Sequence, residues 1–331
     1  MRRPGTGARD RHRGRLLIPL EAIERARATT ADTVSRTPLV RLDVEAPCEI
    51  WLKLECLQPI GSFKLRGATN AIRQADPAEW RAGVWTTSAG NMAQGVCWVA
   101  RELGAPATVV APDHAPRAKL DAVERLGGHV VAVPYDTWWE TMETGAYPGL
   151  GGLFVHPVLD ERVMAGNGVI GLELAEELDG IDAVLVPWGG GGLTTGIASA
   201  LAAVSPSTRV IACEPETGAP LTASLAAGEP VSVDYVPSFV DGAGSKALLP
   251  AMWERARSLV AGAVALSPGE VASAVRLLAT RAHVVAEGAG ALALAAALAG
   301  HGGQGRVVCI VSGGNIDADR LATILAGDVP G

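Results

Sequence analysis

The sequence predicts an α/β protein with two open, mostly parallel twisted sheets that carry helices on both faces. Strand-like runs such as "PATVVAP" (106–112) and "RVVCIVS" (306–312) are apolar throughout. They alternate with Ala- and Leu-rich helical stretches, and this pattern is typical of parallel strands covered on both faces. The strand–helix rhythm also lengthens after about residue 150, which favours two separate sheets.

The predicted elements follow one another without a repeat of fixed period. The first group is a strand and loop, a helix ended by a glycine, a strand, a helix and a strand, at 83–91, 92–104, 106–112, 115–128 and 129–134. The second group runs helix, strand, helix, strand, helix, helix and strand, at 161–178, 182–188, 193–204, 209–215, 267–283, 290–300 and 306–312. Ser267, Pro268 and Glu270 form a capping box with proline at the first helical position.

Composition and charge exclude several classes of protein. The chain has 331 residues, of which 48% are hydrophobic and 19% charged, so it can bury a large core and is not a disordered protein. Its net charge of −7 argues against broad nucleic-acid binding. No apolar run is long enough for a membrane helix, so we expect no membrane association. The five scattered cysteines lack metal spacing and fit buried thiols in a reducing cytoplasm.

A lysine stands in the middle of "GSFKLRGA" (61–68), a segment otherwise suited to burial. A buried ammonium group is costly unless it is paired or neutralised. Lys64 therefore either extends its charge to water along the core surface or forms an imine with a carbonyl cofactor. The segment alone favours the first interpretation, so other parts of the chain must decide.

Three glycine-rich loops each follow a predicted strand, where ligands bind in open α/β sheets. The loop "TSAGNMAQG" (87–95) opens a helix, and its amides could hold a carboxylate. The loop "PWGGGGLTTG" (187–196) lacks the lysine of a nucleotide-binding P-loop and does not match a dinucleotide fingerprint, so a phosphate monoester fits best. In "VSGGNID" (311–317), Ser312 could bond a ring nitrogen or could equally be an ordinary loop serine. Together with Lys64, these loops describe pyridoxal phosphate and an amino-acid substrate.

On these segments the chain resembles the fold-type-II pyridoxal-phosphate enzymes, in particular the threonine/serine dehydratase and serine racemase family. The matching segments occur in the family's order and cover almost everything after about residue 30: "RTPLVRL", "GSFKLRGA", "SAGNMAQG", "PWGGGGL", "VDGAGSK", "EGAGALAL" and "SGGN". The resemblance implies that the cofactor is pyridoxal 5′-phosphate. It further implies that the enzyme is a homodimer.

The resemblance also implies a role for each site residue. Lys64 is the catalytic residue and forms the imine, and Phe63 packs on the cofactor ring. Asn91 bonds the ring hydroxyl, Ser312 bonds the ring nitrogen, and Glu287 lies near the ring. The phosphate is bound by the backbone amides of Gly189, Gly190, Gly191, Gly192 and Leu193. The substrate carboxylate is bound by the loop of Ser88, Ala89, Gly90, Asn91 and Met92.

The predicted domain organisation combines the strand–helix rhythm with the resemblance. Residues 1–17 form a basic, disordered tail with six arginines and one acidic residue among the first fifteen positions. Residues 18–82 and 153–331 form the large cofactor-binding domain, and residues 83–152 form a small mobile domain. We expect no bound metal, because Glu214 matches a family cation ligand but Pro220 replaces the second carboxylate.

The activity implied by the resemblance is that of an ammonia-lyase. The substrate is L-threonine, L-serine or a similar 3-hydroxy amino acid, and β-elimination gives a 2-keto acid and ammonia. A β-replacement synthase that makes a non-protein amino acid is the main alternative, followed by an amino-acid racemase and by a silent binding module. Ala89 replaces a serine that serves as the second proton donor in the racemase. Met92 replaces a histidine, and Trp188 replaces a small aliphatic residue.

Overall fold

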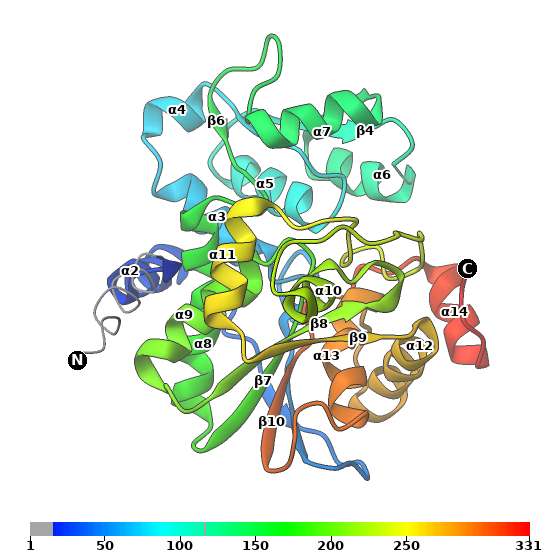
Figure 1. Cartoon of the computed structure of the whole chain (residues 1–331). Helices are drawn as coiled ribbons and strands as arrows, with labels where there is room; N and C mark the ends of the chain where they lie inside the picture. The colour runs from blue at the N-terminus through cyan, green and yellow to red at the C-terminus, as the bar shows by residue number, and fades with distance from the viewer. Residues whose placement is uncertain (1–15, 116) are drawn as a thin grey trace, which may run out of the picture.

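The computed structural model describes residues 16–115 and 117–331. The strands form two sheets, which lie in the lower and upper parts of Figure 1. The six-stranded sheet has the order β1 (Leu39–Arg41), β2 (Glu49–Lys53), β10 (Arg306–Ile310), β7 (Ile181–Pro187), β8 (Arg209–Pro215) and β9 (Gly262–Leu266). The four-stranded sheet has the order β5 (Gly128–Val133), β4 (Ala107–Pro112), β3 (Val84–Thr86) and β6 (Leu153–Phe154).

The predicted fold class is confirmed, because every strand pair is parallel except β1 with β2. The helices are α2 (Leu20–Thr30), α3 (Lys64–Arg73), α4 (Pro77–Arg81), α5 (Asn91–Glu102), α6 (Arg117–Arg125), α7 (Tyr135–Thr144), α8 (Glu161–Glu177), α9 (Gly192–Val204), α10 (Pro220–Ala227), α11 (Pro250–Leu259), α12 (Pro268–Leu277), α13 (Gly288–Leu298) and α14 (Ala318–Ala326). The predicted capping box at Ser267 is present and starts α12.

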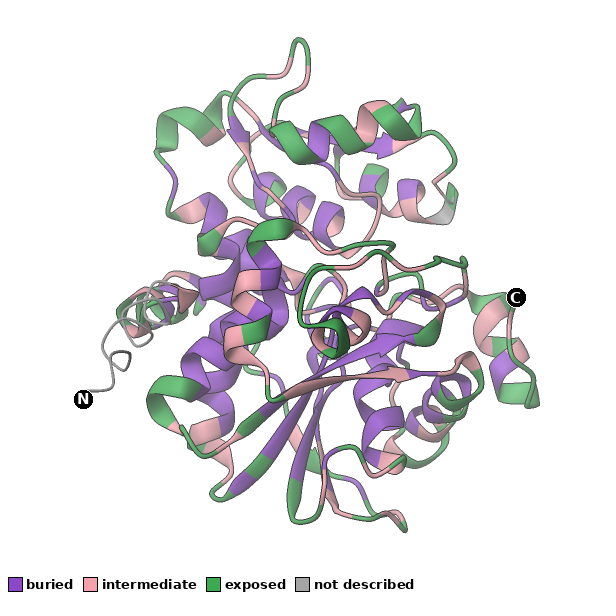
Figure 2. Ribbon diagram, in the orientation of Figure 1, coloured by how far each residue is buried: buried purple, intermediate pink, exposed green. Residues whose placement is uncertain are grey.

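Helices cover both faces of each sheet, as the apolar strand sequences require. In β10, Val307 and Cys309 face the cluster built from α12 and α13, whereas Val308 and Ile310 face α8 and α9. The four-stranded sheet packs against α5 on one face and carries Trp138 of α7 on the other. Figure 2 shows the resulting buried strands and helix faces inside both parts of the molecule.

Three of the four strands of the smaller sheet lie within the predicted small domain. The segment 83–152 contains β3, β4 and β5, and β6 begins directly after it. The division into two domains, with the smaller one mobile, remains a prediction.

Most of the predicted N-terminal tail, residues 1–15, lies outside the described residues. Leu16 is described, and its carbonyl accepts a hydrogen bond from Arg255 (2.7 Å). No helix in the described part of the chain is long and apolar enough to cross a membrane.

Candidate active site

A cavity of about 420 Å³ opens between the two sheets. Segments that follow β3, β4 and β7 line it, so it lies at the carboxyl ends of parallel strands from both sheets. The residues given a role from the sequence all line this one cavity: Phe63, Lys64, Ser88, Ala89, Gly90, Asn91, Met92, Gly189, Gly190, Gly191, Gly192, Leu193, Glu287 and Ser312. The fold therefore brings together segments that are far apart in the sequence.

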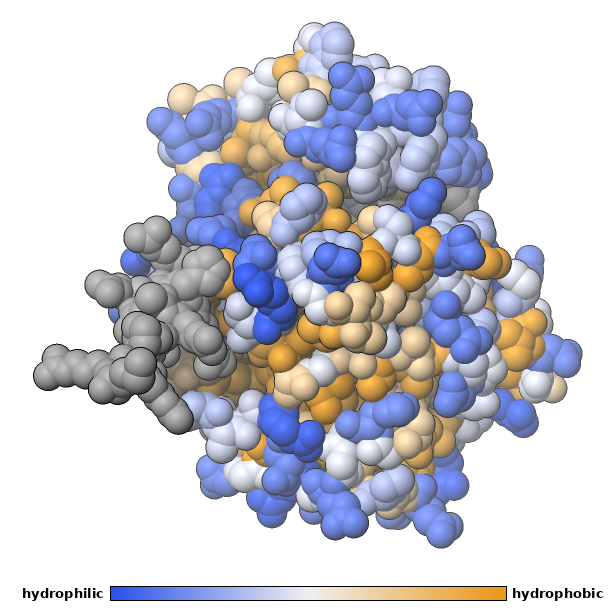
Figure 3. All heavy atoms as spheres, viewed as in Figure 1, coloured by the Kyte–Doolittle hydropathy of each residue, from blue (hydrophilic) through white to orange (hydrophobic). Residues whose placement is uncertain are grey.

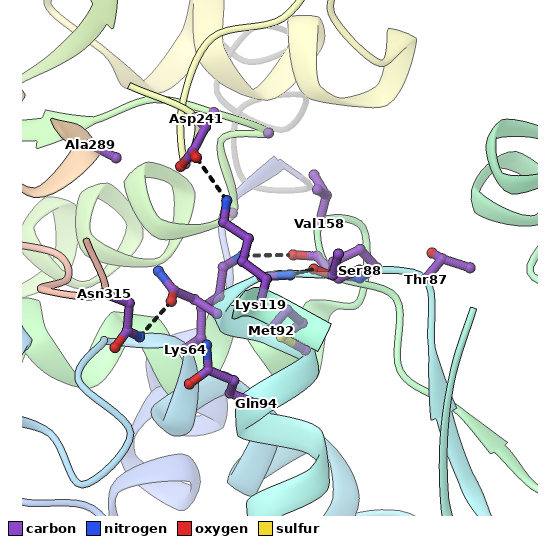
Figure 4. A pocket seen from close by; sticks show the side chains of 18 of the residues that line it. Lys64, Thr87, Ser88, Met92, Gln94, Lys119, Val158, Asp241, Ala289 and Asn315 are labelled. Atoms are coloured by element: carbon purple, nitrogen blue, oxygen red, sulfur yellow. Dashed lines mark hydrogen bonds and ion pairs between the residues drawn. The ribbon is translucent and has the colours of Figure 1, made fainter. Parts of the chain in front are cut away.

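Lys64 is the first residue of α3 and reaches into the cavity (Figure 4). Its Nζ donates a hydrogen bond to the carbonyl oxygen of Pro157 (3.2 Å) and lies 5.1 Å from the centre of the Phe63 ring. Burial of the amine lowers the pKa of Lys64 to about 8, while the nearby Glu287 acts in the opposite direction. The lowered pKa gives this amine a larger neutral fraction near neutral pH than an ordinary lysine has, so it is a better nucleophile and base.

The loop before Lys64 is paired with the loop that contains Ser312. The Phe63 amide donates to the Ser312 carbonyl (3.0 Å), and the Gly314 amide donates to the Gly61 carbonyl (2.9 Å). Ser62 and Gly313 form an antiparallel bridge between these bonds. Backbone hydrogen bonds therefore hold the lysine and the buried Ser312 in one fixed arrangement.

The four-glycine loop connects β7 to α9. Gly191 has φ +91°, and α9 starts at Gly192, so the free amides of its first turn face the loop. A Cβ atom built on Gly190 would lie 2.3 Å from Cγ2 of Val158, so a side chain there would need the wall to move. Close backbone approach and a helix N-terminus are features that suit the binding of an anion.

Trp188 directly precedes the glycine loop, and its ring packs against the loop. Its side chain is buried and does not line the cavity. Its ring lies where a Cβ atom on Gly191 would come within 2.4 Å of it. Trp188 therefore fills the space behind the loop and does not narrow the cavity.

Glu287 is buried beside the cavity and is bound by Asn91. The Asn91 amide donates to Oε1 of Glu287 (2.7 Å), and the Asn315 amide donates to Oδ1 of Asn91 (2.7 Å). Burial, assisted by the charge of Asp241, raises the pKa of Glu287 to about 7, against the hydrogen bond from Asn91. This carboxyl group therefore changes its protonation state near neutral pH.

The loop 88–92 forms the wall of the cavity where α5 begins. The Gly90 amide donates to the Ser88 hydroxyl oxygen (3.3 Å), and α5 starts at Asn91. Met92 is buried, so the substitution of the family histidine makes this end of the cavity less polar. The free amides of the first turn of α5 suit a carboxylate.

Sequence reasoning did not identify several residues that line the cavity. Lys119 of α6 contacts Oδ2 of Asp241 (2.9 Å), which lies in the segment between α10 and α11, and Figure 4 shows this ion pair. Lys119 lies in the helix predicted at 115–128, and no sequence pattern singled it out. The sequence did not point to Pro157 or Val158 as site residues. Their contacts with Lys64 and the glycine loop depend on where the fold places this segment and not on the residue types. Asn315 belonged to a quoted motif without an assigned role.

The residues around the cavity fit pyridoxal phosphate. The Lys64 amine suits the aldehyde, and the side-chain-free glycine loop at the start of α9 suits the phosphate. Asn91 and Ser312 bring polar atoms to the same cavity. The donor set therefore matches the cofactor that the resemblance implies.

Glu214, which matches the family's cation ligand, is hydrogen-bonded to the start of α10. Its carboxylate accepts hydrogen bonds from the amides of Leu221 (3.0 Å) and Thr222 (2.7 Å) and from the Thr222 hydroxyl (2.7 Å). It thus satisfies the start of α10, where Pro220 takes the first position. Among the described residues, no group of three or more His, Cys, Asp or Glu side chains could hold a metal ion.

Comparison with known proteins gives a consistent picture. The sequence model of the family described as "Pyridoxal-phosphate dependent enzyme" matches residues 30–313. The L-threonine ammonia-lyase of Thermotoga maritima is 39% identical over 315 residues, which cover 93% of this chain and 78% of that protein. The structure of maize serine racemase aligns with a TM-score of 0.83 and 31% identity, covering 93% of this chain and 96% of that one. Threonine deaminase isoform 2 from Solanum lycopersicum aligns with a TM-score of 0.80 and 30% identity, covering 93% and 88%.

Proposed function

Because this chain belongs to the pyridoxal-phosphate-dependent enzymes, with pyridoxal 5′-phosphate as its cofactor, we propose that it is an ammonia-lyase. Its substrate is L-threonine, L-serine or a similar 3-hydroxy amino acid, which it converts to a 2-keto acid and ammonia. The observation that carries this proposal is that one cavity is lined by a lysine of lowered pKa, by the four-glycine loop at the start of α9 and by the loop at the start of α5. The likeness to an L-threonine ammonia-lyase supports the reaction type.

Each side chain has a defined part in this proposal. Lys64 would hold the cofactor aldehyde, and the amides of the glycine loop would hold its phosphate. Phe63 would pack on the ring, Asn91 would bond the ring hydroxyl, and Ser312 would accept or donate at the ring nitrogen. The loop 88–92 would bind the substrate carboxylate through the amides at the start of α5. Glu287 would lie beside the ring and share Asn91 with it.

The chemistry of the chain's own residues follows from these positions. When bound, the cofactor withdraws electrons from the substrate Cα and so makes its C–H bond acidic. The Lys64 amine then takes the Cα proton at Nζ, and its pKa of about 8 suits a base at neutral pH. The carboxylate loop holds the substrate with Cα toward Lys64. The substrate loses its β-hydroxyl group as water, and one water is consumed when ammonia and the keto acid form, so the atoms balance.

Racemisation is the second candidate, because the chain is also similar to maize serine racemase. A racemase must return a proton to the face of Cα opposite Lys64. Ala89 lines the cavity and has no proton to give, so elimination is the better-supported outcome. A β-replacement synthase would use the same residues and needs a second nucleophilic substrate.

We also propose that the enzyme is a cytoplasmic homodimer. Free thiols support a reducing compartment, because all five cysteines are unpaired and four of them are buried. Figure 3 shows apolar residues gathered in the middle of one face, with polar residues around them. Tyr235 and Val236, which precede α11, are exposed apolar side chains. Light scattering on the purified protein at several concentrations tests the dimer.

A substrate panel tests the activity. Cofactor-loaded protein is incubated with the L- and D-forms of threonine, serine and other 3-hydroxy amino acids, and keto acid and ammonia are measured. We expect equal amounts of 2-oxobutanoate and ammonia from L-threonine, or of pyruvate and ammonia from L-serine. If substrates shift the absorbance of the bound cofactor but release no keto acid, the ammonia-lyase proposal is wrong and β-replacement takes its place.

A further inference from the structure

The turn formed by residues 156–159 carries the atoms that contact both Lys64 and the glycine loop. The Pro157 carbonyl accepts the hydrogen bond from Lys64 Nζ (3.2 Å). Both Cγ atoms of Val158 lie within 2.9 Å of a Cβ built on Gly190, and the Val158 carbonyl lies 3.3 Å from one built on Gly192. The two parts of the proposed cofactor site, Lys64 and the glycine loop, therefore both depend on one short turn.

One side-chain atom holds this turn. Nδ1 of His156 accepts hydrogen bonds from the amides of Val158 (3.0 Å) and Leu159 (3.0 Å). Both donors are backbone N–H groups, so Nδ1 must be the unprotonated nitrogen and the ring proton of the neutral imidazole must sit on Nε2. His156 itself does not line the cavity.

The surroundings of His156 favour this neutral form. Burial lowers its pKa, and the positive charge of Lys64 acts in the same direction. Asp160 and the backbone of Met142 act in the opposite direction. The segment before the turn is also fixed, because the Thr86 hydroxyl donates to the Val155 carbonyl (2.8 Å) and the Val155 amide donates to the Trp85 carbonyl (2.9 Å).

We propose that His156 is a positioning residue, which holds the Lys64 amine and the wall of the glycine loop in their working places through the 156–159 turn. The inference rests on the proposed function, since it assumes that Lys64 and the glycine loop bind the cofactor. His156 acts through its Nδ1 lone pair and takes no part in proton transfer. Reactive groups need to be held closely by the residues around them, so loss of this acceptor slows the reaction of Lys64.

Two substitutions separate the ring nitrogens. In His156→Asn, the amide oxygen takes the place of Nδ1 and can accept both backbone hydrogen bonds. In His156→Gln, the oxygen lies one bond farther out, at the place of Nε2, and both backbone amides lose their acceptor. His156→Ala removes every acceptor and serves as a second variant where Gln does not fold.

The main readout is the first-order rate at which cofactor-free protein forms an imine with saturating pyridoxal phosphate. It is followed by absorbance at about pH 8, where His156 is neutral. Borohydride reduction and peptide mapping then show whether the adduct is on Lys64. We expect His156→Asn to react within about threefold of the wild type, and His156→Gln and His156→Ala to react about tenfold more slowly.

A second readout isolates the glycine loop. In the Lys64→Ala background the cofactor binds without a covalent bond, so its dissociation constant reports the phosphate site. We expect His156→Gln to raise this constant several-fold, because Val158 no longer supports Gly190, and His156→Asn to leave it near that of the Lys64→Ala parent. The free energy of unfolding of each variant, measured without cofactor, shows how much of the change in the dissociation constant comes from a general loss of stability.

The outcomes separate this inference from the proposed function. A wild-type protein without an adduct on Lys64 would overturn both. A His156→Gln variant that reacts as fast as the wild type would overturn the inference alone. A folded His156→Asn variant that reacts as slowly as His156→Gln would also overturn the inference. A fast Gln variant together with a slow Asn variant would overturn it in favour of Nε2 as the functional nitrogen.

Discussion

The side-chain amide of Asn91 donates to the carboxylate of Glu287 over 2.7 Å, although the two residues are 196 positions apart in the chain. Glu287 is buried, and its pKa is raised from an ordinary 4.5 to about 7, chiefly by burial. In the unfolded chain this carboxyl group loses its proton near pH 4.5. The folded state therefore binds more protons between these two values, so the contribution of Glu287 to the stability of the cofactor-free protein falls as pH rises from about 4.5 to about 7.

The substitution Glu287→Gln should reverse this loss. Glutamine keeps an oxygen that accepts from Asn91 but carries no charge to bury. We expect the free energy of unfolding of the cofactor-free protein to rise by about 1–3 kcal/mol at pH 8 and to change little at pH 5. Urea unfolding at the two pH values measures the difference. Glu229→Gln, at an exposed position, is the control, and an equal gain at both pH values would contradict the account.

Gly191→Ala tests the glycine loop. Its φ of +91° disfavours any side chain, and the new Cβ would also meet the Trp188 ring at 2.4 Å. Gly228→Ala is a matched control, since Gly228 has φ +78° and open space around it. We expect Gly228→Ala to lose about 1 kcal/mol in the free energy of unfolding and Gly191→Ala to lose about 2 kcal/mol or more, together with most phosphate affinity. Equal losses would show that Trp188 does not constrain the loop.

Ala89→Ser tests why elimination is favoured over racemisation. The introduced hydroxyl group would line the cavity, where it supplies a proton donor that alanine lacks. We expect the wild type to make keto acid from L-serine with almost no D-serine, and Ala89→Ser to make measurable D-serine. Chiral chromatography of the reaction mixture quantifies both products. Abundant D-serine from the wild type would contradict the role given to Ala89.

Lys119→Met tests the ion pair at the cavity. Lys119 of α6 and Arg320 of α14 both contact Oδ2 of Asp241, at 2.9 and 3.1 Å, but only Lys119 reaches it from a helix of the four-stranded sheet. A partly exposed pair contributes at most about 1 kcal/mol. We expect Lys119→Met to raise KM for L-threonine by about two- to fivefold with little change in kcat. Arg320→Met is the control. Equal effects of both substitutions would show that the Lys119–Asp241 ion pair has no role of its own at the cavity.

Much of the fold and site could be predicted because both depend on local pattern. Apolar runs such as 306–312 predicted buried parallel strands, and Ser267 with Glu270 predicted the start of α12. Lys64 alone did not predict a site, but together with the three glycine-rich loops it did, and the family resemblance supplied the role of each residue; these residues do line one cavity. Their chemical roles remain predictions until the experiments above are done.

The remaining features depend on tertiary contacts that leave little mark on the sequence. Pro157 contributes a backbone carbonyl, and His156 contributes an acceptor to its own turn, so neither looked unusual in the chain. Lys119 pairs with Asp241 only because the fold brings α6 close to the segment between α10 and α11. The capping of α10 by Glu214 likewise depends on two segments meeting in space.

The central claim is that the Lys64 amine drives β-elimination. Its most direct test is the release of 2-oxobutanoate from L-threonine by cofactor-loaded wild-type protein and by Lys64→Ala at equal cofactor occupancy. We predict steady release by the wild type and a loss of at least about a thousandfold in Lys64→Ala, since one residue both holds the cofactor and takes the proton. Comparable rates from the two proteins would contradict the account.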